Sequence, residues 1–211
     1  MHRQFASFGD QVHLIGLGFG PPQFPEVEFR RLDRGRRKNL ALKALAASRL
    51  LLGLHEAYYW RQPTVRSLVE QLRTLRADVI VANDIDTLPA VVRYANGARI
   101  LYDAHDYAPR QFEDSLYFRI FFQRYATALC QRYIPRVDRM MTVCDGLAEA
   151  YQRDSGVRPV VITNAPDYAE LEARFREPAE RTVRLVHHGA AIRSRHIESM
   201  IQAMTFLDPE R

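Results

Sequence analysis

Short apolar runs alternate along this chain with longer segments of helical periodicity, and this alternation restricts the fold more than any other feature. The runs at 78–82 and 99–103 are typical of strands that lie buried in a parallel sheet. Further strands are expected at 12–17, 27–29, 136–143 and 160–162, and helices at 39–59, 63–76, 88–94, 115–133 and 145–153. Strands that alternate with helices predict an α/β fold, here a Rossmann-like parallel sheet with helices on both faces.

Polar and acidic side chains collect where two of these strands end. Residues 83–89 are Asn-Asp-Ile-Asp-Thr-Leu-Pro, directly after the first run, and residues 102–106 are Tyr-Asp-Ala-His-Asp, at the end of the second. The carboxyl ends of parallel strands meet at one edge of an open α/β sheet, and ligands bind at that edge. We therefore expect Asp84, Asp86, His105 and Asp106 to share a single rim.

The pattern of the chain changes after residue 177. Residues 177–180, Glu-Pro-Ala-Glu, are typical of a linker, and a strand at 183–189 and an amphipathic helix at 197–207 are expected to follow. One strand and one helix are too few to bury a core of their own. The expected organisation is a Rossmann-like domain over residues 1–177, followed over 178–211 by a linker and the first strand–helix unit of a truncated second domain.

Positive charge is concentrated in the first third of the chain. Residues 1–76 contain 13 Lys/Arg and 6 Asp/Glu, a net charge of +7, whereas the whole chain carries +5. Much of this excess lies within residues 30–38. A solvated loop, an anionic membrane surface, a phosphorylated acceptor or nucleic acid would each suit such a stretch. No nucleic-acid-binding motif accompanies it, so nucleic acid is not an expected partner.

Three features of the sequence bear on the compartment. No apolar run reaches the roughly 18 residues that span a bilayer, and the first residues lack the apolar core of a secretory signal. Cys130 and Cys144 do not have the spacing of a disulfide framework. We expect the protein in the cytoplasm, with peripheral contact at the inner face of the membrane through its basic N-terminal third.

Five short motifs, in this order, resemble those of the family 4 glycosyltransferases, whose GT-B architecture places two Rossmann-like domains across a cleft. The family's His-Ala-His-Asp-x-Asp-Thr-Leu-Pro corresponds to residues 81–89, and its Tyr-Asp-Ala-His-Glu to residues 102–106. Its Thr-Val-Ser-x-Gly corresponds to residues 142–146, its Pro-Asn-Gly-Pro-Asp to 163–167, and the strand and basic loop that open its second domain to 183–195. The resemblance covers almost the whole chain and matches the acceptor-side domain.

The resemblance implies that a sugar moves from a nucleotide-sugar donor to a carbohydrate or lipid-linked acceptor with retention of the anomeric configuration. The residues that it implies for the site are catalytic His105 and Asp106, substrate-binding Asp84, Asp86 and Asn164, and donor-phosphate-binding Arg193 and Arg195. The two arginines precede the last expected helix, where guanidinium groups and a helix N-terminus both favour a diphosphate. The nucleotide-sugar is a substrate, and no cofactor is expected.

Several features of the chain depart from the family pattern. The chain is expected to begin after the family's first strand and glycine-rich loop, and it lacks the Glu-x7-Glu element of the donor domain. Cys144 and Ala165 stand where the family has Ser and Gly, and His196 follows Arg195 where the family has Gly. The expected molecule is therefore the acceptor half of an enzyme and is inactive by itself.

Three other interpretations stay open. Asp84 and Asp86 form the Asp-x-Asp pattern that binds a metal–diphosphate in the GT-A architecture, but two carboxylates make a weak magnesium signal. We expect no metal, and instead expect Asp86 and Thr87 to cap the following helix. A non-catalytic or split half-enzyme, which binds a sugar or nucleotide and needs a partner domain, is the main alternative. A dinucleotide-dependent enzyme is disfavoured because no Gly-x-Gly-x-x-Gly follows any expected strand.

Overall fold

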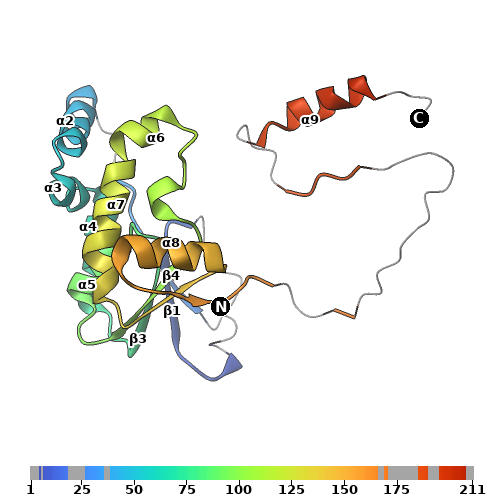
Figure 1. The fold of residues 1–211 in the computed structure, drawn as a ribbon. Coiled ribbons are helices and arrows are strands. Elements are labelled where there is room, and N and C mark those ends of the chain that lie inside the picture. The colour runs from blue at the N-terminus through green and yellow to red at the C-terminus, as the bar shows by residue number, and fades with distance from the viewer. Residues whose placement is uncertain are drawn as a thin grey trace. The chain divides into compact units, whose positions relative to one another are not determined.

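The computed structural model describes residues 5, 7–18, 27–35, 39–165, 169–170, 185–189 and 195–207 (Figure 1). The chain divides into two compact units, Met1–Asn164 and Ala165–Arg211. All strands that the structure describes belong to the first unit. The expected domains at 1–177 and 178–211 stay a prediction, because residues 171–184 lie outside the described part of the chain.

The described strands form two parallel sheets in the first unit. The strands are β1 (Val12–Gly16), β2 (Val27–Arg31), β3 (Val79–Asn83), β4 (Arg99–Ala104), β5 (Arg139–Thr142) and β6 (Val160–Val161). β1 pairs with β2, while β3, β4, β5 and β6 lie in sequence order in a four-stranded sheet. The sequence predicts a single layer, and this detail is wrong because apolar runs identify strands without specifying which edges pair.

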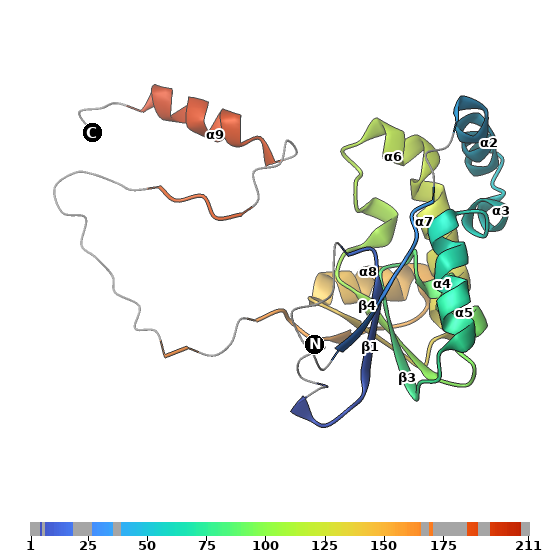
Figure 2. The ribbon, with the colours of Figure 1, turned by 180° about the vertical axis from the view of Figure 1, so that it is seen from behind.

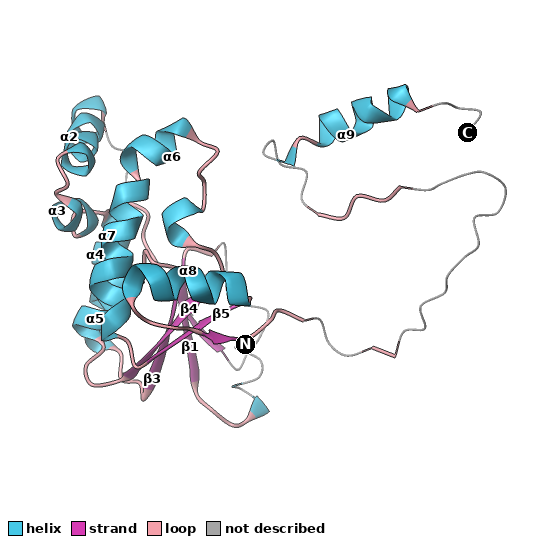
Figure 3. Ribbon diagram, viewed as in Figure 1, coloured by secondary structure: helices cyan, strands magenta, loops and turns pink. Residues whose placement is uncertain are grey.

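Helices connect and flank the strands, which confirms the predicted Rossmann-like α/β class (Figure 3). Those that follow the sequence prediction closely are α4 (Pro63–Thr74), α5 (Leu88–Tyr94) and α8 (Asp145–Ser155). α4 begins at Pro63. Proline suits the first turn of a helix, because an N–H at that position would have no partner within the helix and its absence costs no hydrogen bond. α8 ends at Gly156, whose φ of 76° is left-handed and favours glycine. Their apolar faces and β4 share one buried core.

Two long helices expected from periodicity are each broken in two. Residues 39–59 form α2 (Leu40–Leu51) and α3 (His55–Tyr59), with Gly53 between them at a φ of 71°. Residues 115–133 form α6 (Leu116–Phe121) and α7 (Gln123–Tyr133), which meet at Phe122. The Phe122 ring packs edge-on against Tyr58 and Tyr125. Packing against Tyr58, a ring from another helix, therefore accompanies a bend that helical periodicity does not reveal.

The second unit contains α9 (Ile197–Ala203), followed by one 3₁₀ turn at Met204–Phe206, within the helix predicted at 197–207. Residues 185–189, expected in a strand, have no regular secondary structure. A strand needs a neighbouring strand for its backbone hydrogen bonds, and this segment has none among the described residues. Among the described residues of both units, no helix is long and apolar enough to cross a bilayer.

Candidate functional site

The backbone turns sharply at Asp84, directly after β3. Its φ of 63° lies in the left-handed region, which Asp adopts more readily than most residues with a side chain. The Asp84 N–H donates to the carbonyl of Asp103 at 3.4 Å, and its own carbonyl accepts from the N–H of Thr87 at 3.2 Å. These bonds continue the pairing of β3 with β4 and hold the 84–87 turn at the carboxyl edge of the sheet.

A distant tyrosine takes over the capping role that the sequence assigns to Asp86 and Thr87. Thr87 occupies the predicted N-cap position of α5, but its hydroxyl donates backward to the carbonyl oxygens of Asn83 and Asp84, at 2.7 and 3.0 Å, so the expected side-chain cap does not form. The buried Tyr59 hydroxyl donates to the Asp86 carbonyl at 2.9 Å and accepts from the Ala90 N–H at 3.1 Å. That N–H belongs to the first turn of α5, where amides have no partner within the helix. Tyr59 thus holds the turn and the helix start together.

A second buried tyrosine holds the loop after β4 in the same manner. The hydroxyl of Tyr151, on α8, donates to the Asp106 carbonyl at 2.7 Å and accepts from the Ala108 N–H at 3.1 Å. The Asp106 carboxylate also accepts from Nε2 of Gln111 at 3.0 Å. Sequence reasoning missed both tyrosines, because a Tyr on an apolar helix face carries no local sign that its hydroxyl meets a loop far along the chain.

Asp103 and His105 form a contact next to these loops. His105 Nε2 lies 3.1 Å from Oδ2 of Asp103, an ion-pair contact whose angle is outside hydrogen-bond geometry. Asp103 is only 3% exposed, whereas the His105 side chain is 44% exposed. Burial raises the pKa of the Asp103 carboxyl, His105 opposes this shift, and the charge of Asp84 adds to it. The imidazole is therefore at the surface and turned toward a buried carboxyl.

Three carboxylates line one cavity of about 250 Å³ at the carboxyl edge of the sheet: Asp84, Asp86 and Asp106. Asp86 keeps surface in contact with solvent, yet protein atoms crowd its carboxyl group. This burial raises the pKa of Asp86, and the negative charge of Asp84 raises it further. Carboxylates in such a cavity accept hydrogen bonds from hydroxyl groups and repel phosphate.

An apolar cavity of about 380 Å³ adjoins the carboxylate cavity. The two share the residues Ile85, Asp86, Ala108, Gln111 and Phe112. The remaining wall of the apolar cavity comes from the loop before α6 and from α6 and α7: Ser115, Tyr117, Phe118, Phe122, Tyr125 and Ala126. The carboxylates and the aromatic wall thus belong to two adjoining cavities.

The predicted site residues separate into those that the structure brings together and those that it does not. The register of β3 and β4 pairs Asn83 with Asp103, so the two loops that follow lie at the same edge. His105 lies at that edge but lines neither cavity, and Asn164 is exposed beyond β6 and also lines neither. The predicted roles of all these side chains stay predictions.

The roles of the two predicted phosphate-binding arginines stay predictions. Arg193 lies outside the described residues, and Arg195 is exposed just before α9 in the second unit. Among the residues that the structure describes, no group of three or more His, Cys, Asp and Glu side chains is arranged to hold a metal ion. The site of the first unit therefore consists of carboxylates, an amide, aromatic rings and His105 nearby.

Comparison with known proteins adds one match. The model of the family described as Glycosyltransferase Family 4 matches residues 1–170, which include the whole first unit and both cavities. No curated protein matches the chain.

Proposed function

Because the chain belongs to glycosyltransferase family 4, we propose that it is the acceptor-side half of an enzyme that moves a sugar from a nucleotide-sugar to a carbohydrate or lipid-linked acceptor. The observation that carries this proposal is the cavity lined by Asp84, Asp86 and Asp106. Its carboxylate oxygens suit the hydroxyl groups of a sugar or of another hydroxyl-bearing acceptor. No cofactor is required, since the nucleotide-sugar supplies the reactive group.

The transfer breaks the bond between the anomeric carbon and the diphosphate oxygen and forms a bond from that carbon to the acceptor oxygen, with retention. The proton of the acceptor hydroxyl passes to the nucleoside diphosphate as this leaves. Asp106 lines the cavity, so its carboxylate would orient this hydroxyl, while the exposed His105 would approach the donor sugar. Arg193 and Arg195 would neutralise the leaving diphosphate, and Asn164 would contact substrate.

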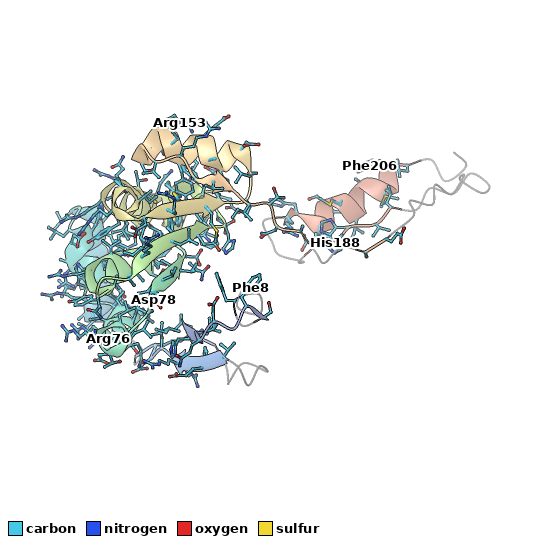
Figure 4. The ribbon with its side chains drawn as sticks, turned by 90° about the horizontal axis from the view of Figure 1, so that it is seen from below. Phe8, Arg76, Asp78, Arg153, His188 and Phe206 are labelled. Carbon is cyan, nitrogen blue, oxygen red and sulfur yellow. The ribbon has the colours of Figure 1, made fainter. Side chains whose placement is uncertain are left out.

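Sugar binding to the chain itself tests the site. Methyl hexosides are titrated into the protein by ligand-observed NMR, with Asp84→Asn as the variant and Asp78→Asn as the matched control. Asp78, labelled in Figure 4, directly precedes β3, at the end of the strand opposite to Asp84. Asp84→Asn should weaken binding severalfold, while Asp78→Asn should not change it. Equal affinity in both variants would remove the carboxylate cavity from the site.

Turnover tests the catalytic assignments. The chain alone is expected to show no transfer, because the matched family domain, residues 1–170, is only the acceptor side of the proposed enzyme, and detectable transfer would contradict that expectation. In a form of the enzyme that carries a donor domain, His105→Ala should lower kcat by at least tenfold. Unchanged kcat would exclude His105 from the chemistry.

A split half-enzyme or non-catalytic sugar-binding module is the second candidate. It is favoured by the extent of the family match, which covers the first unit and only the first residues of the second. A separately produced donor domain that restores transfer on mixing would support the split form. Sugar binding without transfer under any such combination would support the non-catalytic form.

We also propose a cytoplasmic location with contact to an anionic membrane through α2 and α6. These helices contact each other and lie at the same end of the first unit (Figures 1 and 2). Of α2 only Leu50 is buried, and α6 has no buried residue. Neither helix contains an acidic residue, and Lys43, Arg49 and Arg119 make both positive. Exposed leucines with basic neighbours suit the boundary of an anionic bilayer.

Vesicle sedimentation tests this contact. The protein should sediment with vesicles of phosphatidylcholine and phosphatidylglycerol, and less with phosphatidylcholine alone. Leu42→Ser should reduce sedimentation severalfold, whereas Ile162→Ser, at a similarly exposed position (51% and 56%), should not. Equal sedimentation of the two variants would contradict the assignment to α2.

A further inference from the structure

We infer that the apolar cavity between α6, α7 and the 108–112 loop binds the non-sugar, apolar part of a neutral acceptor whose hydroxyl end meets Asp84, Asp86 and Asp106. The acceptor class is then a neutral amphiphile, such as a glycolipid or an alkyl or aryl glycoside. This inference rests on the proposed function and specifies its acceptor. It depends on three properties of the two cavities: aromatic lining, adjacency and charge.

Several aromatic side chains of the apolar cavity are not buried in the protein core. Phe112 and Tyr117 are both exposed, and α6 as a whole buries no residue. The Phe112 and Phe118 rings meet edge-on with centroids 5.7 Å apart, and Tyr117 packs against Phe122 with centroids 5.6 Å apart. Large aromatic side chains gain most of their stabilisation from burial. An apolar ligand in this cavity would supply the cover that the described chain does not.

The two cavities adjoin, and the proposed acceptor spans both. Ile85, Asp86 and Gln111 belong to the walls of both cavities. Gln111 is already held by the Asp106 carboxylate at 3.0 Å, which fixes an amide at the junction. A molecule with its hydroxyl groups on the carboxylate side and its apolar part on the aromatic side matches this order of surfaces.

The charge at the junction selects against a phosphate-headed lipid. Three carboxylates line the polar cavity, and no Arg or Lys of the described residues lines either cavity. A phosphate placed there would meet like charges without a cation to offset them. A hydroxyl-rich neutral head group instead finds acceptors for its hydrogen bonds. The acceptor is therefore neutral at the position next to Asp86.

Paired ligands test this inference on the intact chain. Methyl and octyl hexosides with the same sugar are titrated by calorimetry below the micelle concentration, together with octyl phosphate. The octyl glycoside should bind at least tenfold tighter than the methyl glycoside, because burying several methylene groups is favourable. Octyl phosphate should bind at least tenfold more weakly than the octyl glycoside.

Variants assign the effect to the two cavities. Phe118→Ala should bring the octyl affinity close to the methyl affinity, and Phe118→Trp, which fills the cavity without removing core volume, should do the same. Asp84→Asn should weaken both glycosides by the same factor. Phe206→Ala changes an exposed Phe in the other unit (Figure 4) and should leave both affinities unchanged.

The outcomes separate this inference from the proposed function. Equal binding of methyl and octyl glycosides, with Asp84→Asn still weakening both, would overturn the apolar subsite and leave the sugar site intact. Binding of octyl phosphate as tight as that of the octyl glycoside would overturn the neutral class. Absence of binding by every glycoside would overturn the inference and the sugar site together. Tail-dependent binding without transfer by a form that carries a donor domain would keep the subsite and reject the transferase.

Discussion

Removal of the Tyr59 hydroxyl is expected to loosen the loop that carries Asp84 and Asp86. The hydroxyl donates to the Asp86 carbonyl at 2.9 Å and accepts from the Ala90 N–H at 3.1 Å. Tyr59→Phe keeps the ring and its edge-on contact with Trp60, at a centroid distance of 4.8 Å. The change therefore removes two hydrogen bonds and little else.

The size of the effect follows from the surroundings of the two partners. Ala90 is fully buried, so its N–H loses its hydrogen-bond acceptor and water cannot replace it. A buried donor left without a partner costs about 1–3 kcal/mol. The Asp86 carbonyl belongs to an exposed residue and can regain a bond to water. We expect the free energy of unfolding to fall by about 1–3 kcal/mol, with the loss arising mainly at Ala90.

Urea unfolding followed by the fluorescence of Trp60, the only tryptophan of the chain, measures this loss. Tyr94→Phe is the matched control, because the half-buried Tyr94 hydroxyl forms no hydrogen bond to any of the described residues. Amide hydrogen exchange should also become faster at Ala90 and across the 84–88 turn in Tyr59→Phe. Equal stability of the two variants, with unchanged exchange at Ala90, would refute the argument.

Three further predictions concern charge, thiols and a helix end. Asp86→Asn should raise Tm at pH 7, and this gain should vanish below pH 3.8. Burial raises the pKa of the Asp86 carboxyl in the folded state, so the carboxyl ionises first in the unfolded chain and its ionisation destabilises the fold as pH rises. A gain in Tm that grows in acid would contradict this. In the native protein a disulfide reagent should modify only the exposed Cys144, because burial raises the pKa of Cys130 to about 12; equal rates at both thiols would be inconsistent with the fold. Gly156→Ala should lower the free energy of unfolding by about 1 kcal/mol, because the φ of Gly156 is 76°. An added Cβ would meet no atom within 4 Å, so the cost comes from the backbone alone. Gly146→Ala, at a position with equal space and no positive φ, should not destabilise.

Much of the first unit follows from local sequence pattern. The apolar runs predict the strands, and the predicted bounds of α4, α5 and α8 agree closely with the structure. The polar residues after β3 and β4 lie at one edge of the sheet, as parallel strand ends must. Asp84, Asp86 and Asp106 then meet around one cavity. Strand ends and side-chain chemistry were sufficient to indicate these three.

Other parts of the site depend on contacts that no local pattern contains. The sequence groups His105 with the acidic side chains, but in the structure its ring is turned to Asp103 and lines neither cavity. The apolar cavity requires the break between α6 and α7 at Phe122. An uninterrupted helix over 115–133 would hold these aromatic residues in a different arrangement.

The sequence by itself determined the class of fold, the identity of the residues at the strand ends and their position at a common edge. The tertiary structure alone decided that the strands form two sheets and that Tyr59 and Tyr151 hold the two loops. Periodicity records which neighbours within a few residues share a face, whereas the hydroxyls of Tyr59 and Tyr151 meet carbonyls 27 and 45 residues away. Such pairs exist only after the helices have packed on the sheet.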